Sequence, residues 1–178
     1  MKLLRTIRLD PSDNFVFDKA AEPGEWAVPG GFAFANAEPE NLANKARVAF
    51  RSGFLGIDSL GWSTLVQIVE ASEADRAQAI AMLADRLIKF FGAPNVSAAQ
   101  DAAAEEIEFA ASLCGHPPGT LIAMHRVYED GAIRETFRTL RPREGAKPLR
   151  AFAFLEVEGD DEPQDGIALV DLAREPRG

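Results

Sequence analysis

The chain has 178 residues, of which 47% are hydrophobic and 26% charged, with a formal net charge of −9. Such a chain is long enough for one globular domain with a buried core. The acidic balance argues against partners such as nucleic acids or anionic membranes, because both require a basic surface. Cys114 is the only cysteine, so no intrachain disulfide is expected. Without a signal-peptide pattern or an apolar run of ~20 residues, we expect a cytoplasmic protein with no membrane span.

The first third of the chain predicts strands followed by a helix. Lys2–Leu9 has strand character. Trp26–Ala35 also does, although Pro29-Gly30-Gly31 interrupts it and favours a bulge or a sheet edge. A helix is predicted to open at Glu38-Pro39, and Gly53 is its expected C-cap.

The middle of the chain predicts one central strand and two helices. After an irregular connection, Trp62–Glu70 is apolar on both faces, as in a strand covered on both sides. Ser72 and Asp75 then form a capping pattern, and Ser97 with Gln100 forms a second one. Apolar stripes at helical spacing follow both patterns.

The clearest local signal is a hairpin in the stretch TLIAMHRVYEDGAIRETFRTLRP, Thr120 to Pro142. Asp130-Gly131 is typical of a two-residue type I′ turn. Pairing outward from that turn places six pairs opposite each other, namely Tyr128 with Ile133, Val127 with Arg134, Arg126 with Glu135, His125 with Thr136, Met124 with Phe137 and Ala123 with Arg138.

Alternation along these strands separates two faces of the hairpin. The predicted core face carries Ile122, Met124, Tyr128, Ile133 and Phe137, and on it Arg126 and Glu135 lie opposite each other and are able to pair. The other face mixes small apolar residues with cationic and hydrogen-bonding ones, namely Ala123, His125, Val127, Arg134, Thr136 and Arg138.

The element order predicts an α+β fold with a mostly antiparallel sheet of about five to six strands and about three helices packed mainly on one face. The crossover through the two long helices leaves open one parallel strand pair. A last strand is predicted at Leu149–Val157. We assign residues 1–158 to a single domain and residues 159–178 to an acidic, mobile tail.

Cys114, His116 and His125 are the only thiol and imidazole groups, and their spacing matches no zinc motif. Cys114 falls on an apolar helix stripe near a helix C-terminus, where the dipole disfavours a thiolate. We therefore predict a buried structural cysteine, no metal, no cofactor and no catalytic residue.

The most plausible binding site is the polar hairpin face. His125, Arg134, Thr136 and Arg138 would suit an anion, because two guanidinium groups on one face can bind a carboxylate or phosphate. The alternative is a solvated sheet face, or arginines paired with acidic residues. Residues 156–171 offer seven acids and no Lys or Arg for such pairing.

Three stretches, MKLLRTIRLDPSD, FRSGFLGIDSLGWSTLVQIVEAS and AIRETFRTLRPREGAKPLRAFAFLEVE, resemble a family of uncharacterised bacterial proteins of about this length. The resemblance covers most of residues 1–158. It implies a single soluble bacterial domain and brings no activity, cofactor or site residue with it.

Two hypotheses of function follow. The first is a non-catalytic accessory protein that binds a protein partner or forms a homodimer, using an acidic surface suited to a basic partner, or a sheet edge. The alternative is a protein that binds an anionic small molecule, or a small enzyme, using the Arg/His face of the 120–142 hairpin.

Overall fold

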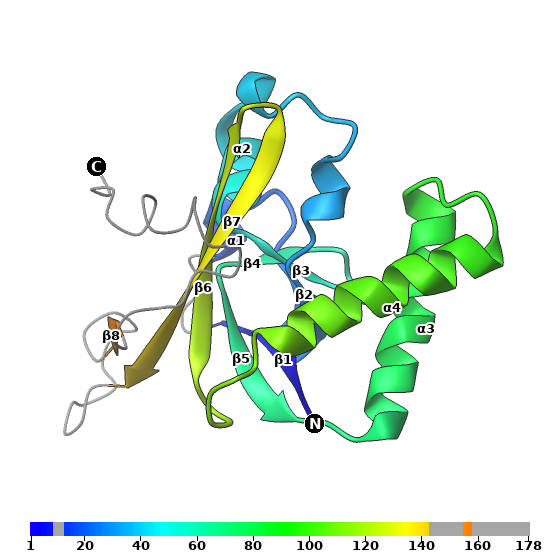
Figure 1. The fold of residues 1–178 in the computed structure, drawn as a ribbon. Helices are drawn as coiled ribbons and strands as arrows, with labels where there is room; N and C mark the ends of the chain where they lie inside the picture. Colours follow the sequence, from blue (N-terminus) through cyan, green and yellow to red (C-terminus); the bar gives the residue numbers. More distant parts are fainter. Residues whose placement is uncertain (9–12, 143–154, 158–178) are drawn as a thin grey trace.

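The structure, a computed structural model, describes residues 1–8, 13–142 and 155–157. Its centre is one curled antiparallel sheet in the order β4-β3-β2-β1-β5-β6-β7-β8 (Figure 1). Its strands are β1 (Lys2–Ile7), β2 (Trp26–Val28), β3 (Phe54–Gly56), β4 (Trp62–Ser63), β5 (Leu65–Glu70), β6 (Leu121–Glu129), β7 (Ala132–Pro142) and the short β8 (Leu155–Val157).

Among the described residues, three helices longer than one turn pack around this sheet. They are α2 (Asn44–Ser52), α3 (Glu73–Phe90) and α4 (Val96–Ser112), and the shorter elements are α1 (Asp13–Val16) and the 3-10 turns η1 (Gly31–Phe34) and η2 (Pro39–Asn41). The helices α3 and α4 pack against each other, with α4 against β1 and β2, whereas α2 lies against β6 (Figure 1). None of the described helices is long and apolar enough to cross a bilayer.

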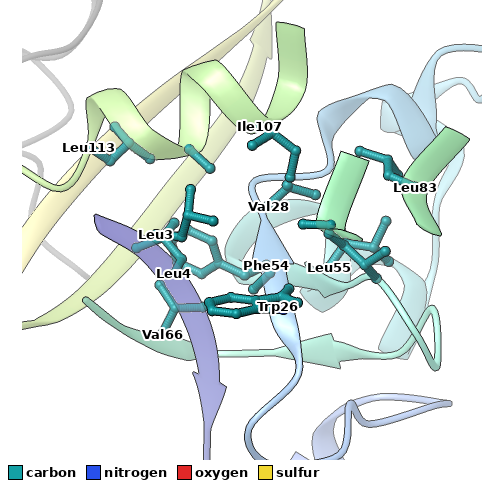
Figure 2. Close-up of a cluster of buried hydrophobic side chains, with 14 of the residues drawn as sticks. Leu3, Leu4, Trp26, Val28, Phe54, Leu55, Val66, Leu83, Ile107 and Leu113 are labelled. Carbon is teal, nitrogen blue, oxygen red and sulfur yellow. The ribbon is translucent and has the colours of Figure 1, made fainter. Parts of the chain in front are cut away.

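The main core lies where the helix pair meets the centre of the sheet (Figure 2). Leu3 and Leu4 are adjacent in β1 and both are buried, so this strand is covered on both faces. Ile107 of α4 and Leu83 of α3 enter the same cluster as Val28 of β2. Small residues on both helices allow this close approach, because Ala79, Ala99 and Ala103 are fully buried.

The α+β class and the antiparallel sheet are confirmed, but the expected number of strands is too low. Seven strands lie in the described parts of residues 2–142, and β8 pairs at the edge beside β7. The parallel pair left open by the crossover does not occur, because β5 and β6 are antiparallel neighbours. The helix pair returns the chain to the end of the sheet from which it left, so β6 runs back along β5.

Three element predictions are corrected. Trp62–Glu70 is not one strand, because the chain breaks at Thr64 and its two halves pair with different neighbours, β4 with β3 and β5 with β1 and β6. The presumed irregular connection contains β3. The expected strand Trp26–Ala35 ends at Val28, since Gly30 adopts φ 78° and a 3-10 turn follows.

The helix caps give one success and one correction. Ser72 and Asp75 form the predicted reciprocal capping box of α3. The cap of α4 is Asn95, whose side chain accepts a hydrogen bond from the N–H of Ala98, and not Ser97. Asparagine is as good an N-cap as serine, and the capping pattern at Ser97 predicts the helix start two residues too late.

The hairpin is confirmed with every predicted pair in register. Asp130 and Gly131 both have positive φ, 54° and 76°, as a type I′ turn requires. Ile122, Met124 and Phe137 are buried as predicted, but Tyr128 is 41% exposed because this end of the hairpin extends beyond the core. Most of the predicted strand Leu149–Val157 and all of residues 159–178 lie outside the described residues.

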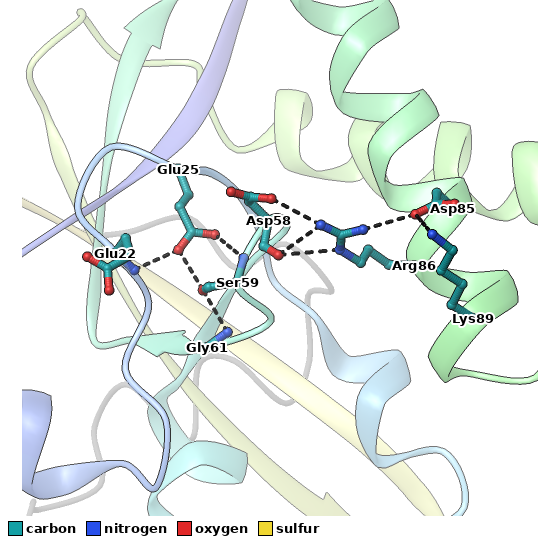
Figure 3. A network of polar contacts seen from close by, with 8 residues as sticks. All are labelled: Glu22, Glu25, Asp58, Ser59, Gly61, Asp85, Arg86 and Lys89. Atoms are coloured by element: carbon teal, nitrogen blue, oxygen red, sulfur yellow. Dashed lines mark hydrogen bonds and ion pairs between the residues drawn. The ribbon is translucent and has the colours of Figure 1, made fainter.

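A polar network fixes the loop between β3 and β4 (Figure 3). The Glu25 carboxylate accepts hydrogen bonds from the Ser59 N–H and hydroxyl at 2.8 and 2.6 Å. Arg86 of α3 pairs with Asp58 at 3.0 Å and with Asp85 at 2.9 Å. The network therefore ties α3 to a loop at the opposite edge of the sheet from the hairpin.

Candidate functional site

The four predicted site residues lie on one face of the hairpin, as the alternation requires. His125 and Thr136 are direct cross-strand partners. Thr136 is only 4% exposed, and Arg134 forms an ion pair of 3.5 Å with Glu129. His125 and Arg138 also interact with other groups of the protein. The anion site on this face stays a prediction, and of its four residues only His125 lines the cleft described next.

The cleft lies between α2 and β6 and has a volume of about 280 Å³. The cleft exists because β5 pairs with only the first part of β6. The last described pair is Leu65 with Ala123, whereas β6 continues to Glu129. The lining residues come from η2, α2 and four consecutive positions of β6, namely Pro39, Glu40, Arg47, Phe50, Arg51, His125, Arg126, Val127 and Tyr128. Four consecutive strand residues show that an edge of β6, rather than one face, borders the cleft.

The hairpin register sets the direction of the main-chain groups along this edge. In a hairpin with a two-residue turn, the residues flanking the turn exchange hydrogen bonds, and the alternate residues direct their N–H and C=O groups outward. Arg126 and Tyr128 are such alternate residues of β6. Within the described part of the chain, no hydrogen bond is seen to these outward groups of either residue.

Arg126 holds the wall of the cleft in place. Its side chain is fully buried, and its Nε donates to Glu135 at 2.8 Å. Its two terminal nitrogens donate to the carbonyls of Phe50 in α2 and of Pro29, each at 2.7 Å. A cation suits the last carbonyls of a helix, where the dipole is negative. One side chain therefore joins α2, the β2–η1 loop and the hairpin.

Glu106 of α4 adds a second carboxylate to this buried cluster. Its Oε2 accepts a hydrogen bond from the Gly30 N–H at 3.0 Å. Desolvation by burial raises the pKa of Glu106, against the opposing effects of this hydrogen bond and of the Arg126 charge, while the Glu135 charge raises it further. Arg126 and the two glutamates therefore act as a structural cluster beneath the cleft.

The wall formed by α2 is locally basic in an acidic protein. The helix contains Lys45, Arg47 and Arg51 and no acidic residue. Arg47 and Arg51 are both exposed and both line the cleft, one helical turn apart. The Arg47 guanidinium donates twice to the Leu42 carbonyl, at 2.7 and 3.0 Å. Arg51 shows no ion pair with any other described residue, so its charge faces solvent and the cleft.

The other chemically distinctive group is buried elsewhere. Cys114 belongs to the main core, and its Sγ donates to the Ala110 carbonyl at 3.4 Å. Desolvation raises the pKa of its thiol to about 12, so it is protonated at neutral pH. Among the described residues, no group of three or more His, Cys, Asp or Glu gathers in a way that could hold a metal ion.

Comparison with known proteins gives one result. Residues 1–158 match the sequence profile of a family of unknown function, DUF6505. The chain belongs to the DUF6505 family. No curated protein and no solved structure gives a significant match to this DUF6505 chain.

Sequence reasoning missed the α2 side of the cleft. Arg47 and Arg51 lie 74 residues or more before His125 in the chain, and only the fold brings them together. One signal was available in the sequence: three cations without an acid in nine residues is unusual for a chain of net charge −9. No local sequence pattern predicts that β5 pairs with only the first part of β6 and leaves the rest of its edge uncovered.

Proposed function

We propose that this DUF6505 protein is a non-catalytic binding protein that receives a segment of a protein partner in the cleft between α2 and β6. The observation that carries the proposal is the edge of β6 bordering an open cleft beyond the end of β5. Free strand edges bind extended segments through main-chain hydrogen bonds, and adjoining pockets select side chains.

The composition of the cleft supports binding rather than catalysis. Phe50, Pro39 and Tyr128 supply apolar contact area, and the guanidinium groups of Arg47 and Arg51 supply charge. Arginine and tyrosine are the residue types that dominate binding energy at protein interfaces. Arg126, the most buried polar residue in the lining, is engaged with Glu135 and two carbonyls, which suits a rigid wall.

The proposal is tested by placing a photo-crosslinking phenylalanine analogue at Tyr128, in cells that naturally produce the protein. Phe90 is the matched control, because it is also an exposed aromatic residue but lies at the far end of α3. We expect a discrete adduct from position 128 and none of the same mass from position 90. The captured partner, once purified, should bind the unmodified protein and lose about tenfold in affinity with Tyr128→Ala.

The proposal would be contradicted by the same adduct from both positions. It would also be contradicted if the purified partner bound the Tyr128→Ala variant with unchanged affinity. The absence of any adduct at position 128 would do so too, since an exposed cleft residue should lie within reach of the partner.

A second candidate function is binding of a small anionic molecule in the same cleft. Its volume of about 280 Å³ approaches the ~300 Å³ at which ligand pockets begin. His125, one of the four predicted site residues, borders it together with two arginines. A thermal-shift screen with succinate, glutamate and inorganic phosphate tests this function, because a ligand of the folded state raises the unfolding temperature. A shift that survives Arg51→Glu would show that the anion binds elsewhere.

A further inference from the structure

The charge and spacing of the α2 wall point to the chemistry of the segment that the cleft binds. Resting on the proposed function, we propose that the partner segment is extended and carries carboxylates at alternate positions, in an acid-x-acid pattern. Arg47 and Arg51 bind the two carboxylates from α2, and the edge of β6 lies along the other side of the segment.

The first step is the sign of the charge. The charged residues lining the cleft are Glu40, Arg47 and Arg51 at its rim, together with the already paired Arg126. The rim is therefore net positive, although the whole chain carries −9. A local cationic site in an acidic protein favours an anionic segment, and the surrounding acids repel anions that miss the cleft.

The second step is the spacing of the cations. Arg51 follows Arg47 by four positions in α2, which is a rise of roughly 6 Å along the helix. In an extended chain, two residues advance roughly 6.6 Å and return the side chain to the same face. Carboxylates at positions i and i+2 of a segment running along α2 therefore match the two guanidinium groups. Adjacent acids would point to opposite faces, and only one of them could reach α2.

The third step is what the other residues of the segment meet. Pro39, Phe50 and Tyr128 line the cleft and offer apolar contacts. The outward N–H and C=O groups of Tyr128 offer main-chain hydrogen bonds at the exposed end of β6. An extended segment can use both, whereas a helix satisfies its own main-chain groups internally.

Two fluorescein-labelled peptides of identical composition test the proposal by fluorescence anisotropy at low salt. One has the order Val-Glu-Val-Glu-Val, with both acids on one face, and the other has the order Val-Val-Glu-Glu-Val. We expect the alternating peptide to bind at least about fivefold more tightly, and Arg51→Glu to weaken it at least about tenfold. Arg47→Glu should weaken it as well.

Lys45→Glu is the matched control. It reverses a charge on the same helix, but Lys45 does not line the cleft, so the alternating peptide should keep its affinity. Circular dichroism confirms that each variant is folded. Equal affinities for the two peptides, no measurable binding of the alternating one, or an equal loss from Lys45→Glu would each overturn the inference.

These outcomes are separable from those of the proposed function. A partner crosslinked at position 128 whose bound segment lacks paired acids would refute the acid-x-acid pattern and leave the partner-binding function standing. Binding of the alternating peptide without any crosslinked partner would contradict the partner-binding function and leave the preference of the cleft for the acid-x-acid pattern standing.

Discussion

Arg126 is the residue on which the position of α2 depends. A fully buried guanidinium is stable only if its donors are satisfied, and Arg126 reaches Glu135 and the carbonyls of Phe50 and Pro29. The rings of Phe34 and Phe50 lie 5.6 and 5.8 Å from its guanidinium carbon. Burial works against the charge and lowers the pKa of Arg126, but Glu135 opposes that effect.

The first prediction concerns Arg126→Met. It leaves the Glu135 carboxylate without its cation and two carbonyls without a donor, so we expect a loss of about 3–5 kcal/mol in the free energy of unfolding. Urea denaturation measures it. Arg134→Met is the control, because the Arg134–Glu129 pair is partly exposed and exposed pairs contribute at most about 1 kcal/mol. Equal losses in the two variants would show that Arg126 does not organise the cluster.

The second prediction concerns the raised pKa of Glu106. Because the folded protein binds this proton more tightly than the unfolded chain does, stability falls as the pH rises from the ordinary glutamate pKa through the raised one. Glu106→Gln keeps an acceptor for the Gly30 N–H and removes the charge. We therefore expect the variant to be more stable than the wild type at pH 7.5, with the difference shrinking toward acidic pH.

Urea unfolding of both proteins across this pH range provides the measurement. Glu105→Gln, on the exposed side of the same helix, should leave the pH dependence of stability unchanged. A destabilising effect of Glu106→Gln at pH 7.5 would mean that the carboxylate is needed in its ionised form.

At the scale of elements, the predictable parts of the fold are those fixed by near neighbours in sequence. The hairpin register follows from Asp130-Gly131 and alternation alone, and the start of α3 follows from Ser72 and Asp75. The break at Thr64 was not predictable in this way. Most residues of the Trp62–Glu70 stretch favour a strand, and only the competition between neighbouring strands divides it.

The cap of α4 gives a third prediction. Asn95 accepts a hydrogen bond from the Ala98 N–H at 2.8 Å, whereas Ser97 lies within the first turn of the helix. Asn95→Ala should therefore cost about 1 kcal/mol of stability, and Ser97→Ala should change it by less than about 0.5 kcal/mol. Thermal or urea unfolding compares the two variants directly. A larger loss of stability from Ser97→Ala than from Asn95→Ala would place the start of the helix at Ser97, as the sequence pattern predicts.

For the candidate site, the sequence indicated the polar face of the hairpin, where the anion site stays a prediction, whereas the cleft borders the edge of β6. The polar face of β6 and β7 is a property of alternation, so His125, Arg134, Thr136 and Arg138 could be placed together in advance. The cleft instead depends on which strand runs beside β6 and where α2 packs. Those are properties of the whole molecule, because they join segments more than 50 residues apart.

The whole molecule unfolds in one cooperative step only if the helix pair and the sheet share the main core. Cys114 reports on that question, because it is the only cysteine and is buried with residues of α3, α4, β1 and β2. A thiol that reacts only after global opening is protected about tenfold for each ~1.4 kcal/mol of stability. We therefore expect labelling by a thiol reagent to be at least about a thousandfold slower in the native protein than in the denatured chain.

The fourth prediction combines this reporter with the residue-scale variants. If the hairpin and its buried cluster belong to the same cooperative unit as the helix pair, Arg126→Met should accelerate Cys114 labelling by the factor that its measured loss of stability implies. Lys45→Glu, an exposed change on α2, should leave the rate unchanged. Destabilisation by Arg126→Met without faster labelling would show that α2 and the hairpin open separately from the core. The cleft would then be able to widen while the rest of the fold stays closed.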